Sequence, residues 1–89
     1  MTSQEVTVVN QLGMHARAAA KFVHLATRYE ARVKVARDRR EMDGKSIMGI
    51  LLLAASQGTR ITLAVTGDDE GDAFAAVEDL IARSFDEEE

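Results

Sequence analysis

The sequence contains no cysteine, no proline and no tryptophan, and the absence of cysteine excludes the most. Without thiols there is no disulfide, no thiolate metal site and no cysteine nucleophile. A chain without disulfides, whose first residues lack the cationic and apolar regions of a signal peptide, is expected to be cytoplasmic. The longest apolar run, Ile50 to Ala55, is far too short to cross a membrane.

Aromatic residues and positive charge are also scarce. The 89 residues carry a net charge of −4, and 46% of them are hydrophobic. These values predict one globular domain over residues 1–85, followed by an acidic tail over residues 86–89. They also disfavour a nucleic-acid binder, because no predicted strand carries an aromatic stacking platform. The aromatic residues are Phe22, Tyr29, Phe74 and Phe85.

Hydrophobic periodicity predicts four strands and three helices in the order βαββαβα. The strands are expected over residues 6–9, 32–36, 41–43 and 60–65, and the helices over 16–28, 46–56 and the segment after the acidic turn 67–70. The first helix has an apolar stripe made of Ala19, Phe22, Val23 and Ala26. In so short a chain this order predicts an α+β open-faced sandwich, a four-stranded antiparallel sheet with three helices on one face.

His15 lies between the first predicted strand and the first predicted helix. At the helix N-cap it would adjoin backbone N–H groups that have no helical partner, and these form an anion site with the helix dipole. The dipole disfavours a protonated ring and so preserves a nucleophilic lone pair. Arg17 offers planar donors to the oxygens of an arriving phosphoryl group. On spacing alone, a structural N-cap or surface histidine is the commoner occurrence.

The predicted helix after Ser46 is apolar on almost all sides. One arc, suited to the core, contains Ile50, Leu53 and Ala54. The adjoining arc contains Ile47, Met48 and Leu51. The second arc is either core or an exposed docking patch, since a helix on one side of a sheet cannot bury both arcs equally. Ser46 is an N-cap candidate, and a phosphate there would place about two negative charges beside the patch.

A basic stripe begins beside His15 and runs along the first helix, opposite its apolar stripe. It contains Arg17, Lys21, His24 and Arg28. A solvated face is the commoner explanation for each residue alone, but the stripe as a whole would steer an acidic partner towards His15. His15 and His24 stand about half a turn apart, which disfavours a shared metal site, and the sequence predicts no metal or cofactor.

Two segments of the chain carry a family resemblance. Gly13-Met14-His15-Ala16-Arg17-Ala18-Ala19 resembles the active-site signature of HPr proteins, the phosphocarriers of the bacterial phosphotransferase system. Lys45-Ser46-Ile47-Met48-Gly49 resembles their regulatory-serine segment, at the usual separation. The resemblance extends from the first strand to the last helix and includes the element order.

The resemblance implies that His15 accepts a phosphoryl group on Nδ1 from phosphorylated enzyme I, which takes it from phosphoenolpyruvate. The group then passes to an EIIA domain, in a sugar-transport relay without turnover of a small molecule. Arg17 would stabilise the phosphoryl group, and Ser46 would be a substrate of HPr kinase/phosphorylase. The implied docking face contains Ala20, Lys21, His24, Ile47, Met48 and Leu51. A carrier that binds several partners through one face is expected to be a monomer.

One position departs from the family signature, because Ala18 stands where proline is usual. Proline pre-sets the first turn of a helix, but alanine is an excellent helix former, so the anion site is still expected. Two alternatives stay open. The first is an NPr-type, nitrogen-related carrier, which shares the motif. The second, from another class, is a non-phosphorylated regulatory binding module.

Overall fold

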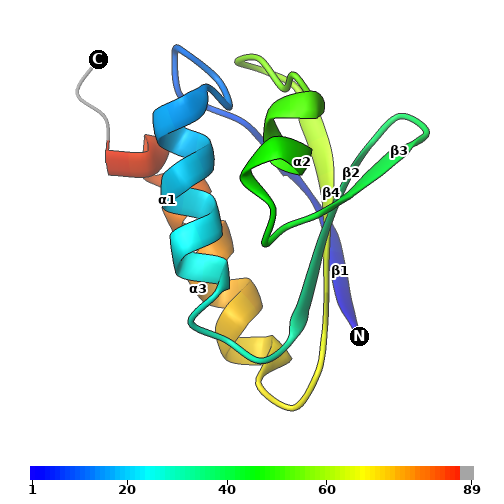
Figure 1. Cartoon of the computed structure of the whole chain (residues 1–89). Coiled ribbons are helices and arrows are strands. Elements are labelled where there is room, and N and C mark those ends of the chain that lie inside the picture. Colours follow the sequence, from blue (N-terminus) through cyan, green and yellow to red (C-terminus); the bar gives the residue numbers. More distant parts are fainter. Residues whose placement is uncertain (87–89) are drawn as a thin grey trace.

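Four antiparallel strands form one sheet in the order β1-β4-β2-β3, and three helices cover one of its faces (Figure 1). This architecture is seen in a computed structural model that describes residues 1–86. The elements are β1 (Thr2–Thr7), α1 (Ala16–Ala26), β2 (Arg32–Arg37), β3 (Arg40–Asp43), α2 (Ile47–Leu52), β4 (Arg60–Thr66) and α3 (Glu70–Ala82). The predicted α+β open-faced sandwich and its βαββαβα order are confirmed.

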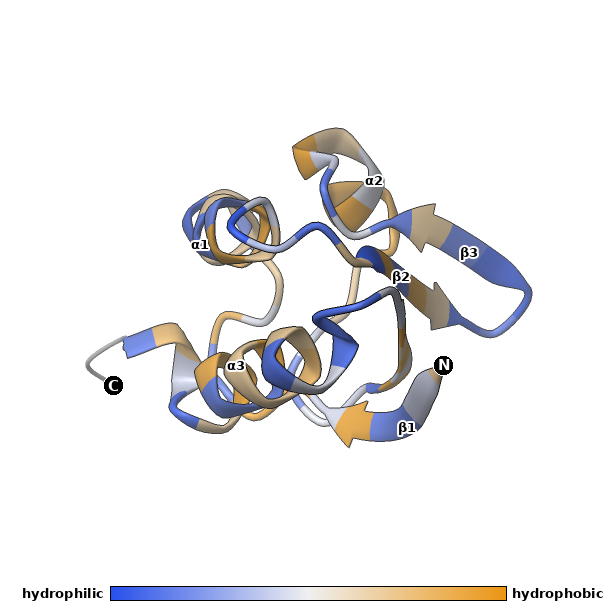
Figure 2. Ribbon diagram, turned by 90° about the horizontal axis from the view of Figure 1, so that it is seen from below, coloured by the Kyte–Doolittle hydropathy of each residue, from blue (hydrophilic) through white to orange (hydrophobic). Residues whose placement is uncertain are grey.

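Strict alternation along the two central strands decides which face of the sheet the helices cover. Val33 and Val35 of β2 lie opposite Val65 and Leu63 of β4, and all four side chains are buried. The residues between them are polar or small and face the uncovered side, as expected from the two-residue period of a strand. Figure 2 shows this alternation along β2 and the three helices on one side of the strands.

Helix α1 buries a wider face than its sequence stripe predicted. Ala19, Phe22 and Ala26 are fully buried as expected, but Ala18 is also fully buried and Val23 is only partly buried. Because α1 contacts both α2 and α3, side chains on two flanks of the stripe meet a neighbouring helix. Ala18, the residue at the proline position of the family signature, therefore packs in the core.

The first strand and the first two helices have other bounds in the structure than predicted. The first strand covers Thr2–Thr7 rather than residues 6–9, since polar residues 2–5 pair with β4 at the edge of the sheet. The first helix ends at Ala26 rather than residue 28. The second helix ends at Leu52 rather than residue 56, because Ala54 adopts a left-handed conformation with φ of 51°.

The acidic turn before α3 ties two loops together instead of capping the helix. Asp69 occupies the N-cap position, but its carboxylate makes no hydrogen bond to the helix. It accepts hydrogen bonds from the backbone N–H groups of Glu30 (2.9 Å) and Ala31 (2.8 Å), which precede β2. These donors, above all the N–H of Glu30, hold the pKa of the Asp69 carboxyl below its ordinary value.

The contribution of Asp69 to stability is therefore present above the ordinary pKa of an aspartate and is lost as the pH falls through the lowered value. The Asp69→Asn variant is expected to have a lower denaturation midpoint than the wild type at pH 7, and the difference should shrink on acidification. The measurement is a series of denaturant titrations from pH 7 to pH 2. Asp68→Asn, a change at the exposed neighbour, serves as the control and should leave the profile unchanged.

After α3 the chain forms a short turn that contacts α1. Ser84–Asp86 form a single turn, η1, in which all three residues have positive φ. The Phe85 side chain is completely buried, and its carbonyl oxygen accepts a hydrogen bond from Lys21 Nζ at 2.6 Å. Asp86, predicted as the first residue of an acidic tail, belongs to this turn. Residues 87–89 of that tail lie outside the described residues.

Candidate functional site

His15 caps the N-terminus of α1, as the sequence predicted. Its backbone is extended (φ −77°, ψ 179°), and its carbonyl oxygen accepts the N–H of Ala19 at 2.8 Å. The Nδ1 atom of the ring accepts the backbone N–H of Arg17 at 3.3 Å. Nδ1 is therefore the hydrogen-bond acceptor of the ring in this arrangement, and its lone pair is directed at the first turn of the helix.

The loop that contains His15 is held by hydrogen bonds and by a close approach to another segment of backbone. Asn10 is completely buried, and its Nδ2 donates to the carbonyl of Gly13 at 2.7 Å. Gly13 has a φ of 66°, and a Cβ atom there would lie 2.6 Å from the carbonyl oxygen of Ala55. That oxygen accepts the N–H of Met14 at 2.8 Å. The position of His15 thus depends on the segment that follows α2, which sequence reasoning did not connect with it.

The basic stripe is only partly a free surface. Arg17, His24 and Arg28 are exposed. Lys21 is half-buried, and its ammonium group is bound to the Phe85 carbonyl, so its role here is to hold η1 against α1. The positive charge near His15 that is open to solvent therefore comes mainly from Arg17, with His24 and Arg28 further along the same helix.

Helix α2 presents an apolar patch to solvent. Ile47 is 46% exposed and Met48 is 67% exposed, in agreement with the predicted outward arc. Leu51, assigned to the same arc, is partly buried against the core. Ala54, assigned to the core arc, is exposed instead, because the helix has already ended and its backbone is left-handed.

Two exposed leucines were missed by sequence reasoning. Leu52, at the last position of α2, is 52% exposed, and Leu12, in the loop before His15, is 68% exposed. An apolar residue inside the turn signal Asn10-Gln11-Leu12-Gly13 was the available clue to the second of them, since such turns are normally polar. We refer to the exposed side chains of α2, Ile47, Met48 and Leu52, together as the apolar patch.

Ser46 caps the N-terminus of α2, also as predicted. Its backbone is extended, and its Oγ accepts the N–H of Gly49 at 3.1 Å. With a rise of about 1.5 Å per residue, the six residues of α2 separate Ser46 by about 9 Å along the helix from the turn that supports the His15 loop. Ser46 and His15 are thus associated with opposite ends of α2, at two sides of the apolar patch.

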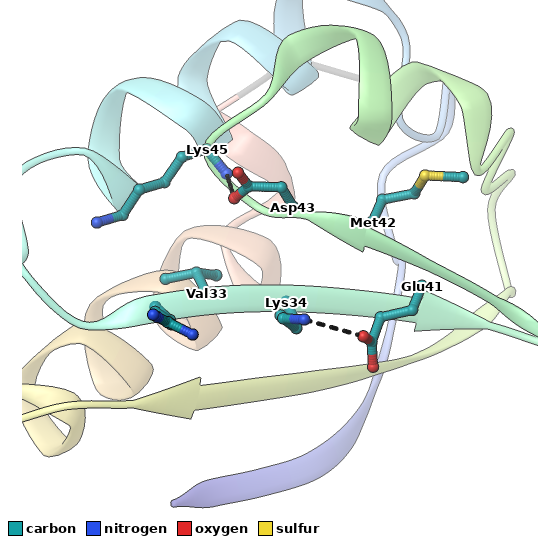
Figure 3. Close-up of a pocket in the computed structure, with 7 residues that line it drawn as sticks. Val33, Lys34, Glu41, Met42, Asp43 and Lys45 are labelled. Carbon is teal, nitrogen blue, oxygen red and sulfur yellow. Dashed lines mark hydrogen bonds and ion pairs between the residues drawn. The ribbon is translucent and has the colours of Figure 1, made fainter.

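Hollows on the described residues are lined by side chains other than His15. One, of about 350 Å³, is lined by residues of β2 and β3 and by Lys45 (Figure 3). Two of its polar side chains are engaged: Lys34 pairs with Glu41 at 3.2 Å, and Lys45 Nζ donates to the Tyr29 carbonyl at 2.7 Å. Within residues 1–86 there is no cluster of three metal-ligating side chains. The features that suit a protein partner are the exposed apolar side chains of α2 and the exposed cations of α1.

No helix among residues 1–86 is long and apolar enough to span a membrane.

Comparison with known proteins gives the following relationships. The family model described as the phosphorylation site of the HPr component of the phosphotransferase system matches residues 2–83. A phosphocarrier protein HPr from Pseudomonas aeruginosa is 48% identical, with both chains covered completely. One from Cupriavidus necator is 45% identical, again over the whole of both chains.

The fold agrees with a solved structure of this kind. The crystal structure of HPr from Thermoanaerobacter tengcongensis superimposes with a TM-score of 0.95 at 40% identity, covering all of both chains. A structure of an HPr dimer from the same organism matches with a TM-score of 0.79, covering 98% of this chain and all of the other.

Proposed function

Because this chain belongs to the HPr family of phosphocarrier proteins, we propose that His15 is its phosphoryl acceptor and that it relays the group between two proteins. The donor is phosphorylated enzyme I, charged by phosphoenolpyruvate, and the acceptor is an EIIA domain. The observation that carries the proposal is the position of His15 at the N-terminus of α1, with Nδ1 turned to the first backbone N–H groups. Phosphoenolpyruvate is a cytoplasmic metabolite, so the relay operates in the cytoplasm.

The geometry supports transfer to Nδ1 rather than to Nε2. The Nδ1 lone pair, which now accepts the Arg17 N–H, forms the new bond to phosphorus while the bond between phosphorus and the donor breaks. The released Arg17 N–H then donates to a phosphoryl oxygen, and the exposed Arg17 guanidinium supplies further charge-assisted donors. The Arg17 N–H therefore has a hydrogen-bond acceptor both before and after the transfer. The adduct is transient, and the protein is a carrier rather than a turnover enzyme.

The docking face of the carrier combines the apolar patch with the exposed part of α1. Ile47 and Met48 offer adaptable apolar contacts, with partly buried Leu51 on the same helix and half-buried Ala20 on α1. His24 and Arg28 attract an acidic partner surface. Lys21 contributes charge but is held by Phe85. Since both partners use this one face in turn, we propose that the active form is a monomer.

The primary test is phosphorylation in a reconstituted mixture of this chain, enzyme I and phosphoenolpyruvate. The expected product carries one phosphoryl group that is stable in alkali and labile in acid, located on His15 by mass spectrometry. Transfer from the purified adduct is then measured to a sugar-type and to a nitrogen-type EIIA domain. The faster acceptor assigns the branch. Labelling on any other residue, or no labelling, would contradict the proposed function.

We further propose that phosphorylation of Ser46 by an HPr kinase/phosphorylase weakens docking. The phosphate would lie at one end of α2, beside Ile47, and would leave the His15 loop at the other end intact. Its charge disrupts the contact by repelling acidic partner groups and by hydrating the apolar patch. Regulation therefore acts on partner binding without refolding the carrier.

Ser46→Asp is expected to lower the rate of His15 phosphorylation by about tenfold at limiting enzyme I, as a higher KM with little change in kcat. Ser46→Ala is the matched control. It removes the helix cap, at a cost of about 1 kcal/mol in the free energy of unfolding, but adds no charge. The Ala variant should phosphorylate at the wild-type rate. Equal rates for the two variants would exclude the electrostatic mechanism.

A further inference from the structure

The segment that supports the His15 loop contains an unfavourable backbone conformation. Ala54, the second residue after α2, has a φ of 51°, in the left-handed region that side chains with a Cβ disfavour. Its side chain is exposed. A non-glycine residue in this region persists when surrounding contacts determine the backbone. The contacts around Ala54 therefore show what holds the turn.

Arg37, the last residue of β2, makes these contacts. Its Nη1 donates to the carbonyl oxygens of Leu53 at 2.8 Å and of Ala54 at 2.7 Å. Arg40, its cross-strand partner in β3, donates to the carbonyl of Leu52 at 3.1 Å. The carbonyl groups of the last helical residue and of the two residues that follow it are thus bound by arginines of the β2–β3 hairpin.

Ala55, the next residue after this turn, contacts the His15 loop. The Ala55 carbonyl accepts the N–H of Met14, the residue before His15, and lies against Gly13. A chain of direct contacts therefore runs from the Arg37 guanidinium through residues 53–55 to the backbone at His15. Every link in it is a hydrogen bond of 2.8 Å or less or a peptide bond.

We propose that Arg37 is a positioning residue for phosphoryl transfer, which holds the left-handed turn at Ala54 and through it the His15 loop. The inference rests on the proposed function of His15. It assigns Arg37 no contact with the phosphoryl group. Loss of Arg37 would let residues 53–55 relax, so that Met14 loses its acceptor and His15 its defined orientation.

The alternative role for Arg37 is that of a further cation of the docking face, since its side chain is 33% exposed. The two roles predict different kinetics. A docking residue changes the KM for this chain as substrate of enzyme I, whereas a positioning residue changes kcat, because the encounter is intact and the nucleophile is misplaced. Arg39, the exposed arginine at the tip of the same hairpin, makes no hydrogen bond to residues 52–54 and is the matched control for charge.

The experiment combines kinetics with amide hydrogen exchange. In Arg37→Ala, kcat for phosphorylation by enzyme I should fall about tenfold with KM unchanged, because small displacements of a reacting group have large effects on rate. Exchange at the Met14 amide should become about tenfold faster, while exchange at Leu63 in the sheet centre stays at the wild-type rate. Arg39→Ala should match the wild type in kcat, in KM and in both exchange rates.

A second substitution tests whether Arg37 acts through the turn at Ala54. Glycine adopts the left-handed conformation readily, so the turn in Arg37→Ala/Ala54→Gly no longer needs the guanidinium. The double variant should recover most of the lost kcat and the slow exchange at Met14. Recovery supports the proposal, because Ala54→Gly restores no charge and no side-chain contact.

Three results would overturn the inference. They are a raised KM with unchanged Met14 exchange, faster exchange at Leu63 in step with Met14, and a double variant no better than Arg37→Ala. Failure of the wild-type chain to be phosphorylated would refute the proposed function instead. The exchange data would then still decide whether Arg37 holds the loop.

Discussion

The His15→Ala variant is expected to accept no phosphoryl group from enzyme I, a loss of about 10³-fold or more, since the nucleophile itself is removed. No other side chain can replace it at the same place, because the lone pair that we propose as acceptor is the one that meets the Arg17 N–H. His24, the second histidine, is exposed on α1, about two and a half turns further on, and does not lie at a helix N-terminus. The measurement is the initial rate of acid-labile labelling with phosphoenolpyruvate as the source.

Alanine at this position also removes a helix cap, so loss of labelling has to be separated from loss of structure. His15→Asn provides that separation, since asparagine is a preferred N-cap residue but offers no nucleophilic ring nitrogen. The unfolding free energy of His15→Asn should lie within about 0.5 kcal/mol of the wild-type value, and the variant should still take up no phosphate. His24→Ala, which keeps His15, should still take up one acid-labile phosphoryl group. Labelling of His15→Asn would show that the acceptor lies elsewhere.

The Gly13→Ala variant is expected to lose about 2–4 kcal/mol of unfolding free energy, from two separate causes. Its φ of 66° is disfavoured for alanine, at about 1 kcal/mol. The added Cβ would also lie 2.6 Å from the Ala55 carbonyl oxygen and 2.8 Å from the Cα of Ser56. Both atoms belong to the backbone, so the loop must move away from α2. The expected readouts are a lower midpoint in denaturant titration and slower phosphorylation of His15.

Gly58→Ala isolates the first of these causes. Gly58 also has positive φ, 86°, but a Cβ there would meet nothing within 4 Å. This control should lose only about 1 kcal/mol and should phosphorylate normally. If the two glycine variants had equal midpoints and equal rates, the close approach between the His15 loop and the segment after α2 would have no energetic importance. The link from Arg37 to His15 would then be weakened as well.

The sequence by itself determined the fold class and the two helix caps. Periods of two and of 3.6 residues depend on which side chains are apolar, and these were sufficient for the βαββαβα order and for most of the core. His15 and Ser46 were also predictable as N-caps, because capping is a local interaction between a side chain and N–H groups two or three residues further on.

Only the tertiary structure decided how the site is supported. The exposure of Ala54 follows from where α2 ends, and that end depends on Arg37, which is 16 or 17 residues away in sequence from the carbonyls that it binds. The Asp69 carboxylate stands at the N-cap of α3 but binds N–H groups 38 and 39 residues away. Lys21, predicted for the docking face, holds Phe85. A charged group at the surface has many partners within reach of its side chain, and its local sequence contains no information on which of them folding brings near.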